Sequence, residues 1–168
     1  IEDKCRKCRK PGETIAHIIN GCSELANNKY KERHDSVAKI LHIALIRAFG
    51  ITQEKQKPYY RYTPETTMER NGIKIYWDRT LRTDREVGSN RPDIVVVDKV
   101  NKKAYIIDIA IPHIHNIQTV YEEKMRKYEA LNREMKRIWE VERIKTYPII
   151  ISSTGHIHSK LLTNLEEI

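Results

Sequence analysis

The chain lacks the cysteine content and the long apolar runs that mark secreted and membrane proteins. It has only three cysteines, all within the first 22 of 168 residues, and an odd, clustered set does not form a disulfide framework. Apolar runs such as 94–97 are far shorter than the roughly 20 residues that span a bilayer. The charged N-terminus has no apolar segment of a signal peptide. We therefore expect a protein of a reducing compartment without membrane contact.

Basic residues are plentiful, with 31 Lys and Arg against 23 Asp and Glu, for a net charge of +8. Such a surface attracts polyanions and releases their counterions. Nucleic acid is therefore the expected partner, although a basic protein without such a partner has the same composition. The length suits one ordinary domain with a small appendage. There is no initiating Met, so we expect a piece of a longer protein.

Hydrophobic periodicity predicts a mixed α/β domain with a small central sheet. Helices are expected from Thr14, where Gly21 keeps the helix short, and then over 30–49, over 117–142 and from His156 onward. Strands are expected at 73–77, 93–98, 104–111 and 148–151, with 99–103 as a hairpin turn. Residues 51–71 are predicted to be a long connection. We divide the chain into a zinc-binding segment, 1–28, and a main domain, 29–168.

The N-terminal segment contains all three cysteines in the pattern C-x2-C-x8-H-x4-C, formed by Cys5, Cys8, His17 and Cys22. Two thiolates from one tight turn and two ligands from a following helix can reach one ion, which predicts zinc. Four protein ligands leave no open position, so the zinc should be structural. The alternative is three free thiols beside an unrelated histidine.

Basic residues surround the first two cysteines. They are suited to neutralising phosphates, although a solvated turn would have the same composition. The residues concerned are Lys4, Arg6, Lys7, Arg9 and Lys10.

Two aspartates occupy unusual places in the strand pattern. Asp93 enters the apolar run 94–97, and Asp108 interrupts the apolar run 105–111. A buried carboxylate is costly unless it is paired or binds a cation. If the two strands form a hairpin, both aspartates lie at the same end of the sheet and can share an ion such as Mg²⁺.

Successive residues of a helix are rotated by about 100°, which places Lys124 in the middle of the apolar stripe of the predicted helix 117–142. We expect its ammonium to point back toward the two aspartates, where it can orient water and stabilise charge on a phosphate. The alternative is that its stem covers apolar neighbours while the charge reaches solvent.

In this order the motifs resemble the restriction-like PD-(D/E)xK endonucleases. The usual lysine position, two residues after the second acid, is Ala110 here. One branch of that superfamily carries its lysine on the following helix and a Cys-Cys-His-Cys segment upstream: the C-terminal endonuclease of site-specific non-LTR retrotransposon proteins. This chain is similar to that branch in its zinc segment, Arg33-His34, Arg91-Pro92-Asp93, Asp108 and the run from Glu123-Lys124 to Lys127-Tyr128.

The resemblance implies an αβββαβ core in which Asp93 and Asp108 hold Mg²⁺ or Mn²⁺ and Lys124 is the catalytic lysine. Lys127 and Tyr128 are secondary catalytic candidates. The implied reaction hydrolyses a phosphodiester of double-stranded DNA and leaves a 3′-hydroxyl that primes reverse transcription of the element's RNA in the nucleus, after synthesis in the cytoplasm. No Tyr-x-Asp-Asp motif of a polymerase is present, so the reverse transcriptase is expected upstream in the full-length protein.

Further polar residues are candidates of lower weight. Arg33 and His34 are candidate DNA contacts, although His34 could instead orient its helix. The loop arginines are plausible phosphate contacts or a solvated loop: Arg79, Arg82, Arg85 and Arg91. Glu32 could reach the metal, and His113 and His115 could approach the scissile phosphate, but exposed side chains without a task are commoner. His156 and His158 receive no assignment.

Two other functions compete with the nuclease. One is a zinc-stabilised DNA- or RNA-binding module whose catalytic centre has decayed, which Ala110 favours and the phase of Lys124 opposes. The other is a structural zinc-knuckle protein, which leaves the folded α/β domain unexplained.

Overall fold

A five-stranded mixed sheet forms the centre of the computed structural model, which describes residues 3–10, 12–53 and 57–168. The strands lie side by side in the order in which they occur in the sequence. Neighbours among the first four strands are antiparallel, and the fourth and fifth strands are parallel to each other. The strands are β1 Thr67–Arg70, β2 Ile73–Trp77, β3 Ile94–Asp98, β4 Lys103–Ala110 and β5 Arg143–Ile150.

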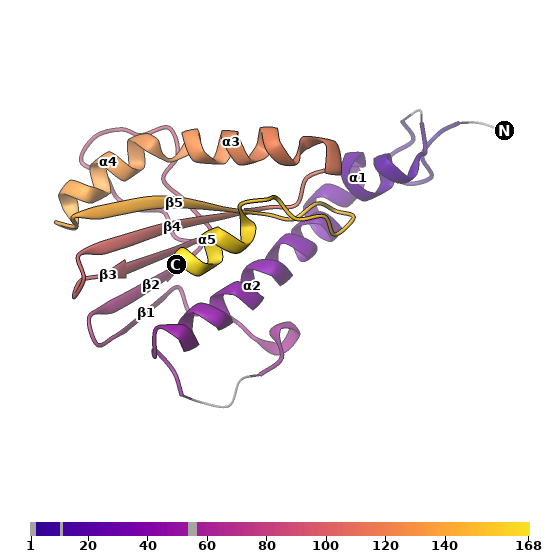
Figure 1. Cartoon of the computed structure of the whole chain (residues 1–168). Coiled ribbons are helices and arrows are strands. Elements are labelled where there is room, and N and C mark those ends of the chain that lie inside the picture. Colours follow the sequence, from indigo (N-terminus) through magenta and orange to yellow (C-terminus); the bar gives the residue numbers. More distant parts are fainter. Residues whose placement is uncertain (1–2, 11, 54–56) are drawn as a thin grey trace.

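Helices cover both faces of this sheet, so the domain has three layers (Figure 1). One face packs against α2 Lys31–Ala48 and α5 Leu161–Glu167, and the other against α3 Ile117–Lys127 and α4 Glu129–Ile138. The N-terminal segment extends away from the sheet as two π-helical segments, His17–Gly21 and Ala26–Tyr30, around the short α1 Ser23–Leu25. None of the helices in the described ranges is long and apolar enough to cross a membrane.

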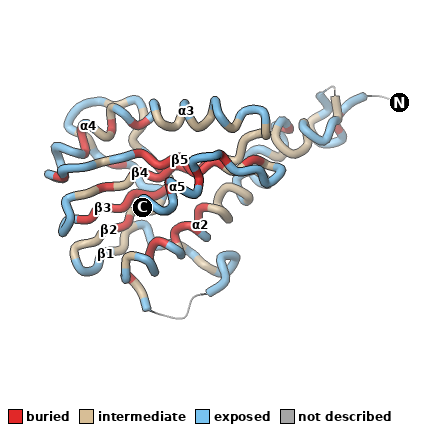
Figure 2. The backbone as a smooth tube through the Cα atoms, in the orientation of Figure 1, coloured by how far each residue is buried: buried red, intermediate tan, exposed pale blue. Residues whose placement is uncertain are grey.

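The alternation of side chains along the strands builds two separate cores. Ile94, Val96 and Ile107 face α2 and α5, whereas Val95 and Ile106 face α4. Because β3 is buried along its whole length, as the red central strands in Figure 2 show, it needs apolar residues on both faces. The run Ile-Val-Val-Val therefore encodes the middle of the sheet.

The prediction of a long connection over 51–71 is wrong at its C-terminal end, where a strand begins at Thr67, and residues 54–56 lie outside the described part of the chain. A single 3-10 turn, Tyr59–Arg61, and strand β1 occupy this stretch. Periodicity missed β1 because its sequence, Thr-Met-Glu-Arg, is polar at an edge of the sheet. Asn71-Gly72, both with positive φ, form the two-residue turn that this dipeptide favours in hairpins.

The predicted helix 117–142 is two helices, interrupted at Tyr128 and ending at Ile138. Glu140 adopts a positive φ of 52° as the chain turns into β5. That strand begins at Arg143, earlier than predicted. The prediction missed its first residues because Arg143 and Lys145 are charged and exposed. The last helix begins at Leu161 rather than at His156, since Ile157 pairs with Ile151 as an isolated β-bridge.

Candidate metal centre and candidate active site

The cysteine and histidine side chains of the N-terminal segment converge on one point. The ligand atoms of Cys5, Cys8, His17 and Cys22 all lie within 4.8 Å of one another. The Cys5 and Cys22 sulfurs are 3.9 Å apart, and Cys8 Sγ lies 3.3 Å from His17 Nε2. A tetrahedral zinc ion with bonds of about 2.0–2.3 Å needs ligand separations of roughly 3.5–3.8 Å. The cluster could therefore bind a metal such as zinc, as the spacing predicts.

A tight turn prepares the first two ligands. The Cys5 amide donates to the Lys10 carbonyl at 2.8 Å, and the Arg9 amide donates to the Cys5 carbonyl at 2.8 Å. Backbone N–H groups of Cys8 and Lys7 directed at the Cys5 sulfur lower the pKa of that thiol to about 7. Because the thiolate is the metal-binding form, the lowered pKa favours metal binding by Cys5, whereas burial and the neighbouring cysteines raise the pKa of Cys8.

Tyr30 and Arg33 fasten the candidate metal centre to the main domain. The Tyr30 hydroxyl accepts from the Cys22 amide at 2.9 Å and donates to the Ile18 carbonyl at 2.8 Å. Arg33 Nη2 donates to the Ile19 carbonyl and to Asn20 Oδ1, both at 3.1 Å. Arg33, predicted as a DNA contact, therefore has partners within the protein. At position 28, where we divided the chain into two segments, the backbone is helical and continues without a break.

The two aspartates come from neighbouring strands at one end of the sheet. Ile94 of β3 pairs with Ile107 of β4, so Asp93 and Asp108, the next residues outward, lie opposite each other. Asp93 Oδ2 accepts the Ile109 amide at 2.6 Å, which joins the first carboxylate to the strand of the second. This proximity is the one expected from a hairpin.

Asp108 is the buried member of the pair, with 2% of its surface exposed. Its Oδ1 accepts from the Tyr128 hydroxyl and lies 3.3 Å from Lys127 Nζ. Its Oδ2 is in ionic contact with Lys124 Nζ but receives no hydrogen bond of normal geometry. Because an ammonium group rotates freely, this contact is an ion pair rather than a directed hydrogen bond. The buried carboxylate oxygen therefore faces a cationic group.

Lys124 and Lys127 reach Asp108 from the last turn of α3, and the helix is interrupted immediately after Lys127. Tyr128 leaves helical geometry, with φ −106° and ψ 7°, and its ring is fully buried under the sheet. Burial and the charge of Asp108 raise the pKa of Tyr128, so the phenol keeps its proton and donates it. We predicted that Lys124 approaches both aspartates; the contact found is with Asp108, to which Tyr128 at the interruption also donates a hydrogen bond.

His34 of α2 is a member of this cluster that the sequence did not place there. Its Nε2 lies 3.2 Å from Asp93 Oδ2, and its Nδ1 lies 3.1 Å from Asp35 Oδ1. The hydrogen bond to Asp93 is the main cause that raises the pKa of His34 to about 9. The imidazole is therefore protonated at neutral pH and holds Asp93 between α2 and β4.

Two cavities border His34, and we name them together the groove beside His34. One, of about 360 Å³, lies between α2 and the end of β2 and is lined by Lys31, Trp77, Arg91 and Asp93 among others. The other, of about 370 Å³, lies between Arg33, Asn116 and the loop that carries Pro112 and His113. Of the two aspartates, Asp93 borders the groove and Asp108 is buried behind it.

The loop arginines differ in how far they are already engaged. Arg91 forms two hydrogen bonds of 2.8 Å with Asp78, and Arg85 lies 3.8 Å from Glu134. Arg79 donates to Thr67 Oγ1 at 2.7 Å. Arg82 is exposed.

The basic residues around the first two cysteines are all exposed. Arg6 pairs with Glu13 at 2.7 Å. The side chains of this set that we predicted to face phosphates are Lys4, Arg6, Lys7, Arg9 and Lys10.

The remaining candidates lie outside the two-aspartate cluster. Glu32 pairs with Lys29 on the surface, and the His113 and His115 rings lie 5.0 Å apart. His158, to which the sequence assigned nothing, stacks on Tyr121 with 4.0 Å between ring centroids and bonds Gln118 at 2.8 Å. It thereby fixes the position of α3, the helix that carries Lys124.

Comparison of the chain with models of protein families and with curated proteins gave no match.

Proposed function

We propose that this chain is a metal-dependent DNA endonuclease with a restriction-like PD-(D/E)xK core, from the C-terminal part of a site-specific non-LTR retrotransposon protein. The observation that carries the proposal is the ion pair between Asp108 of β4 and Lys124 of the next helix, with Asp93 at the same end of the sheet, bonded to the Ile109 amide of β4. The element order of α2, antiparallel β2–β4, α3 and α4, then parallel β5 is compatible with that core, with β1 as an added edge strand.

The carboxylates of Asp93 and Asp108 would hold the catalytic Mg²⁺ or Mn²⁺. Oxygen donors suit these hard cations, and Asp108 Oδ2 is a buried oxygen without a hydrogen bond, in ionic contact with Lys124. When bound, such an ion polarises the phosphate and acidifies a coordinated water. Tyr128 and His34 set the positions of the two carboxylates through their hydrogen bonds to Asp108 Oδ1 and Asp93 Oδ2.

Lys124 is the proposed catalytic lysine, because its ammonium lies at the oxygen of Asp108 that other donors leave free. It would orient the attacking water and offset charge on the phosphate as the P–O3′ bond breaks. Hydrolysis then leaves a 3′-hydroxyl on one fragment and a 5′-phosphate on the other. Lys127, 3.3 Å from Asp108 Oδ1, would supply a second positive charge to the same phosphate.

The groove beside His34 would admit duplex DNA, with Lys31 and Arg91 near the backbone. The basic residues of the N-terminal segment would extend this contact. An exposed 3′-hydroxyl suits target-primed reverse transcription by an upstream polymerase in the nucleus, with the element's RNA as template. The metal cluster of Cys5, Cys8, His17 and Cys22 would hold a structural zinc ion in this scheme.

A plasmid-nicking assay with Mg²⁺ or Mn²⁺ tests the proposal. Asp108→Ala and Lys124→Ala should each lower the nicking rate by at least about 100-fold, the scale of losing one group that stabilises transition-state charge. Lys136→Ala, which removes an exposed lysine of α4, should leave the rate unchanged. A polymerase should extend the nicked strand directly, since the product carries a 3′-hydroxyl.

Equal nicking by wild type and Asp108→Ala would overturn the nuclease proposal. Duplex binding without nicking under either metal would favour the decayed binding module, for which Ala110 at the usual lysine position is the supporting observation.

A further inference from the structure

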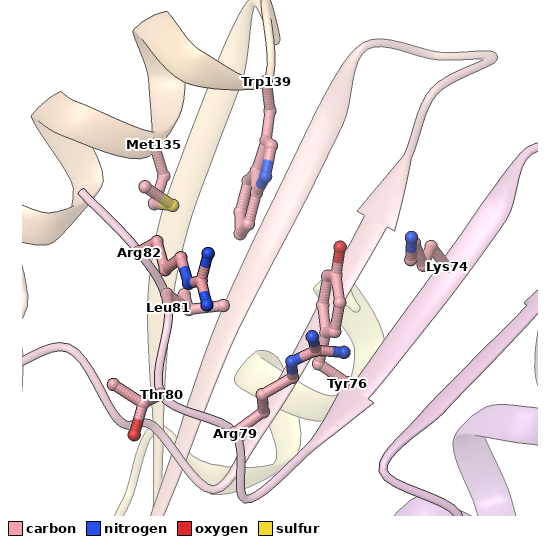
Figure 3. Close-up of a pocket in the computed structure, with 8 residues that line it drawn as sticks. All are labelled: Lys74, Tyr76, Arg79, Thr80, Leu81, Arg82, Met135 and Trp139. Carbon is pink, nitrogen blue, oxygen red and sulfur yellow. The ribbon is translucent and has the colours of Figure 1, made fainter. Parts of the chain in front are cut away.

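A cavity of about 250 Å³ lies on the α4 face of the sheet, away from the groove beside His34. β2 supplies Lys74 and Tyr76, the following loop supplies Arg79 to Arg82, and α4 with its C-terminal residue supplies Met135 and Trp139. Figure 3 shows the Tyr76 and Trp139 rings standing over the sheet with Arg79 and Arg82 beside them. Buried Leu81 and Met135 form an apolar floor. We name these eight lining residues the aromatic pocket.

The two rings of the aromatic pocket are nearly parallel. Their planes differ by 11° and their centroids are 6.1 Å apart. Two rings with a third stacked between them stand about 6.8 Å apart, twice the 3.4 Å stacking repeat of a nucleic acid strand. The observed 6.1 Å is less than this, so a flat group would stack on the rings from outside rather than between them. Both rings are only partly buried, so both have surface that a flat, conjugated group can contact.

Positive charge surrounds these rings. Lys74 Nζ lies 5.3 Å from the centroid of Tyr76, and the Arg79 guanidinium lies 5.7 Å from it. Within the described ranges, the exposed guanidinium of Arg82 has no hydrogen bond or ion pair, and no acidic side chain lines the pocket. Aromatic faces combined with cations are the means by which proteins bind single-stranded nucleic acid.

The aromatic pocket opens on the same face of the sheet as Asp108. Tyr76 pairs with Val95 and Val95 with Ile106, and Asp108 lies two residues further along β4. Two strand spacings and two residues of rise place the Cα atoms of Tyr76 and Asp108 about 12 Å apart. A strand held at Asp108 could therefore reach the aromatic pocket within a few nucleotides.

We propose that the aromatic pocket binds an unpaired nucleobase of a single strand, stacked on Tyr76 and Trp139, with the adjoining phosphate at Arg82 and Arg79. The inference rests on the proposed function for its nucleic acid partner, and it adds that the enzyme holds a strand released from the duplex. A base has a π face whatever its sequence, so the pocket selects single strands without reading them.

Direct binding to fluorescent 12-nucleotide dT and rU strands tests this proposal with the full zinc-loaded chain carrying Asp108→Asn, which prevents cutting. Trp139→Leu should weaken single-strand binding by about tenfold or more, the scale of one base–aromatic stack. Trp139→Phe keeps a ring and should stay within about threefold of the parent. Arg82→Gln should reduce the dependence of log affinity on log salt by about 0.7, the contribution of one phosphate contact.

Arg133→Gln is the matched control, since it removes the charge of an exposed arginine of α4 outside the aromatic pocket. It should leave affinity and salt dependence unchanged. A Trp139-dependent loss with dT, with rU or with both supports the proposal and identifies the strand. Unchanged affinity of Trp139→Leu and of Arg82→Gln for both strands overturns it. Nicking by the otherwise unaltered chain tests the proposed function separately, so the two failures are distinguishable.

Discussion

The two candidate sites of this molecule are assembled in opposite ways. The metal cluster takes all its ligands from one short segment, Cys5 to Cys22. The two-aspartate cluster draws on α2, β3, β4 and α3, which are far apart in the sequence. A spacing pattern can encode the first completely, whereas the second exists only when the sheet and both helical layers are in place.

This difference explains which site residues the sequence could predict. The sequence could predict Asp93 and Asp108 because a hairpin is a local structure. It could predict Lys124 because the helical phase fixes the direction of that side chain. His34 was assigned to DNA or to its own helix. Its contact with Asp93 depends on the angle at which α2 crosses the far face of the sheet, and no local sequence pattern encodes that crossing angle.

The largest expected effect separates the two sites directly. Cys22→Ser should lower bound zinc from one ion per chain to nearly none, because apparent binding energies of structural zinc, about 10–16 kcal/mol, need the full ligand set. Amide hydrogen exchange should then accelerate over residues 12–30 and stay unchanged in β3 and β4. Metal analysis and exchange measured by mass spectrometry provide both readouts.

Ser23→Ala is the control for that experiment, since it alters the neighbouring exposed residue and keeps all four ligands. Faster exchange in β3 and β4 of Cys22→Ser would mean that the two regions unfold as one unit, and the contrast between them would be lost.

The second prediction concerns His42, a fully buried residue of α2. Burial lowers its pKa to about 4, below the ordinary value of about 6.5. The unfolded chain therefore binds the proton more readily, so the stabilisation by neutral His42 is complete above about pH 6.5 and is lost as pH falls toward 4. A shift of this size corresponds to about 3 kcal/mol as an upper bound.

Urea unfolding between pH 7 and pH 4 measures the effect as a difference between wild type and His42→Gln. That difference cancels contributions of metal ligands and carboxylates common to both chains. Glutamine can still accept from the Tyr62 hydroxyl, which lies 2.7 Å from His42 Nδ1. Parallel loss of stability in both chains would show that His42 does not carry this pH dependence.

The fold was predictable where burial is strong and local, and less so elsewhere. The run 94–97 and the hairpin after it follow from apolar residues on both faces and a polar turn. Strand β1 escaped prediction because an edge strand of polar residues has no hydrophobic alternation. The interruption at Tyr128 escaped it because Tyr128 continues the apolar stripe of 117–142 without a Gly or Pro, and its hydrogen bond to Asp108 is a tertiary contact.

A third prediction tests whether that tertiary contact supports the two-aspartate cluster. Tyr128→Phe removes the hydroxyl that donates to the buried Asp108 carboxylate. A hydrogen bond to a charged group contributes about 1.5–3 kcal/mol, so the free energy of unfolding should fall by about 2 kcal/mol in urea titration. The metal cluster should keep its zinc.

Tyr147→Phe is the comparison for Tyr128→Phe, because its hydroxyl reaches Glu167 at the surface at 3.3 Å. Its expected cost is below about 1 kcal/mol, the usual range of solvent-exposed polar contacts. Equal losses in the free energy of unfolding for the two variants would contradict the prediction that the hydrogen bond of Tyr128 to Asp108 contributes more than a surface contact.

The smallest expected effect lies at the junction of the two regions, where Arg33 holds Ile19 and Asn20. Arg33→Lys keeps the charge but loses the planar guanidinium, whose Nη2 donates both hydrogen bonds, and Arg33→Gln loses both the charge and the guanidinium. If Arg33 is a structural tie, both variants should speed amide exchange over residues 17–22 and lower stability by about 1 kcal/mol. Neither should alter the salt dependence of duplex binding. If Arg33 binds a phosphate, as the sequence suggested, Arg33→Gln alone should lower that dependence by about 0.9. Because the Arg33 guanidinium already donates to two oxygens of the N-terminal segment, we expect the first outcome.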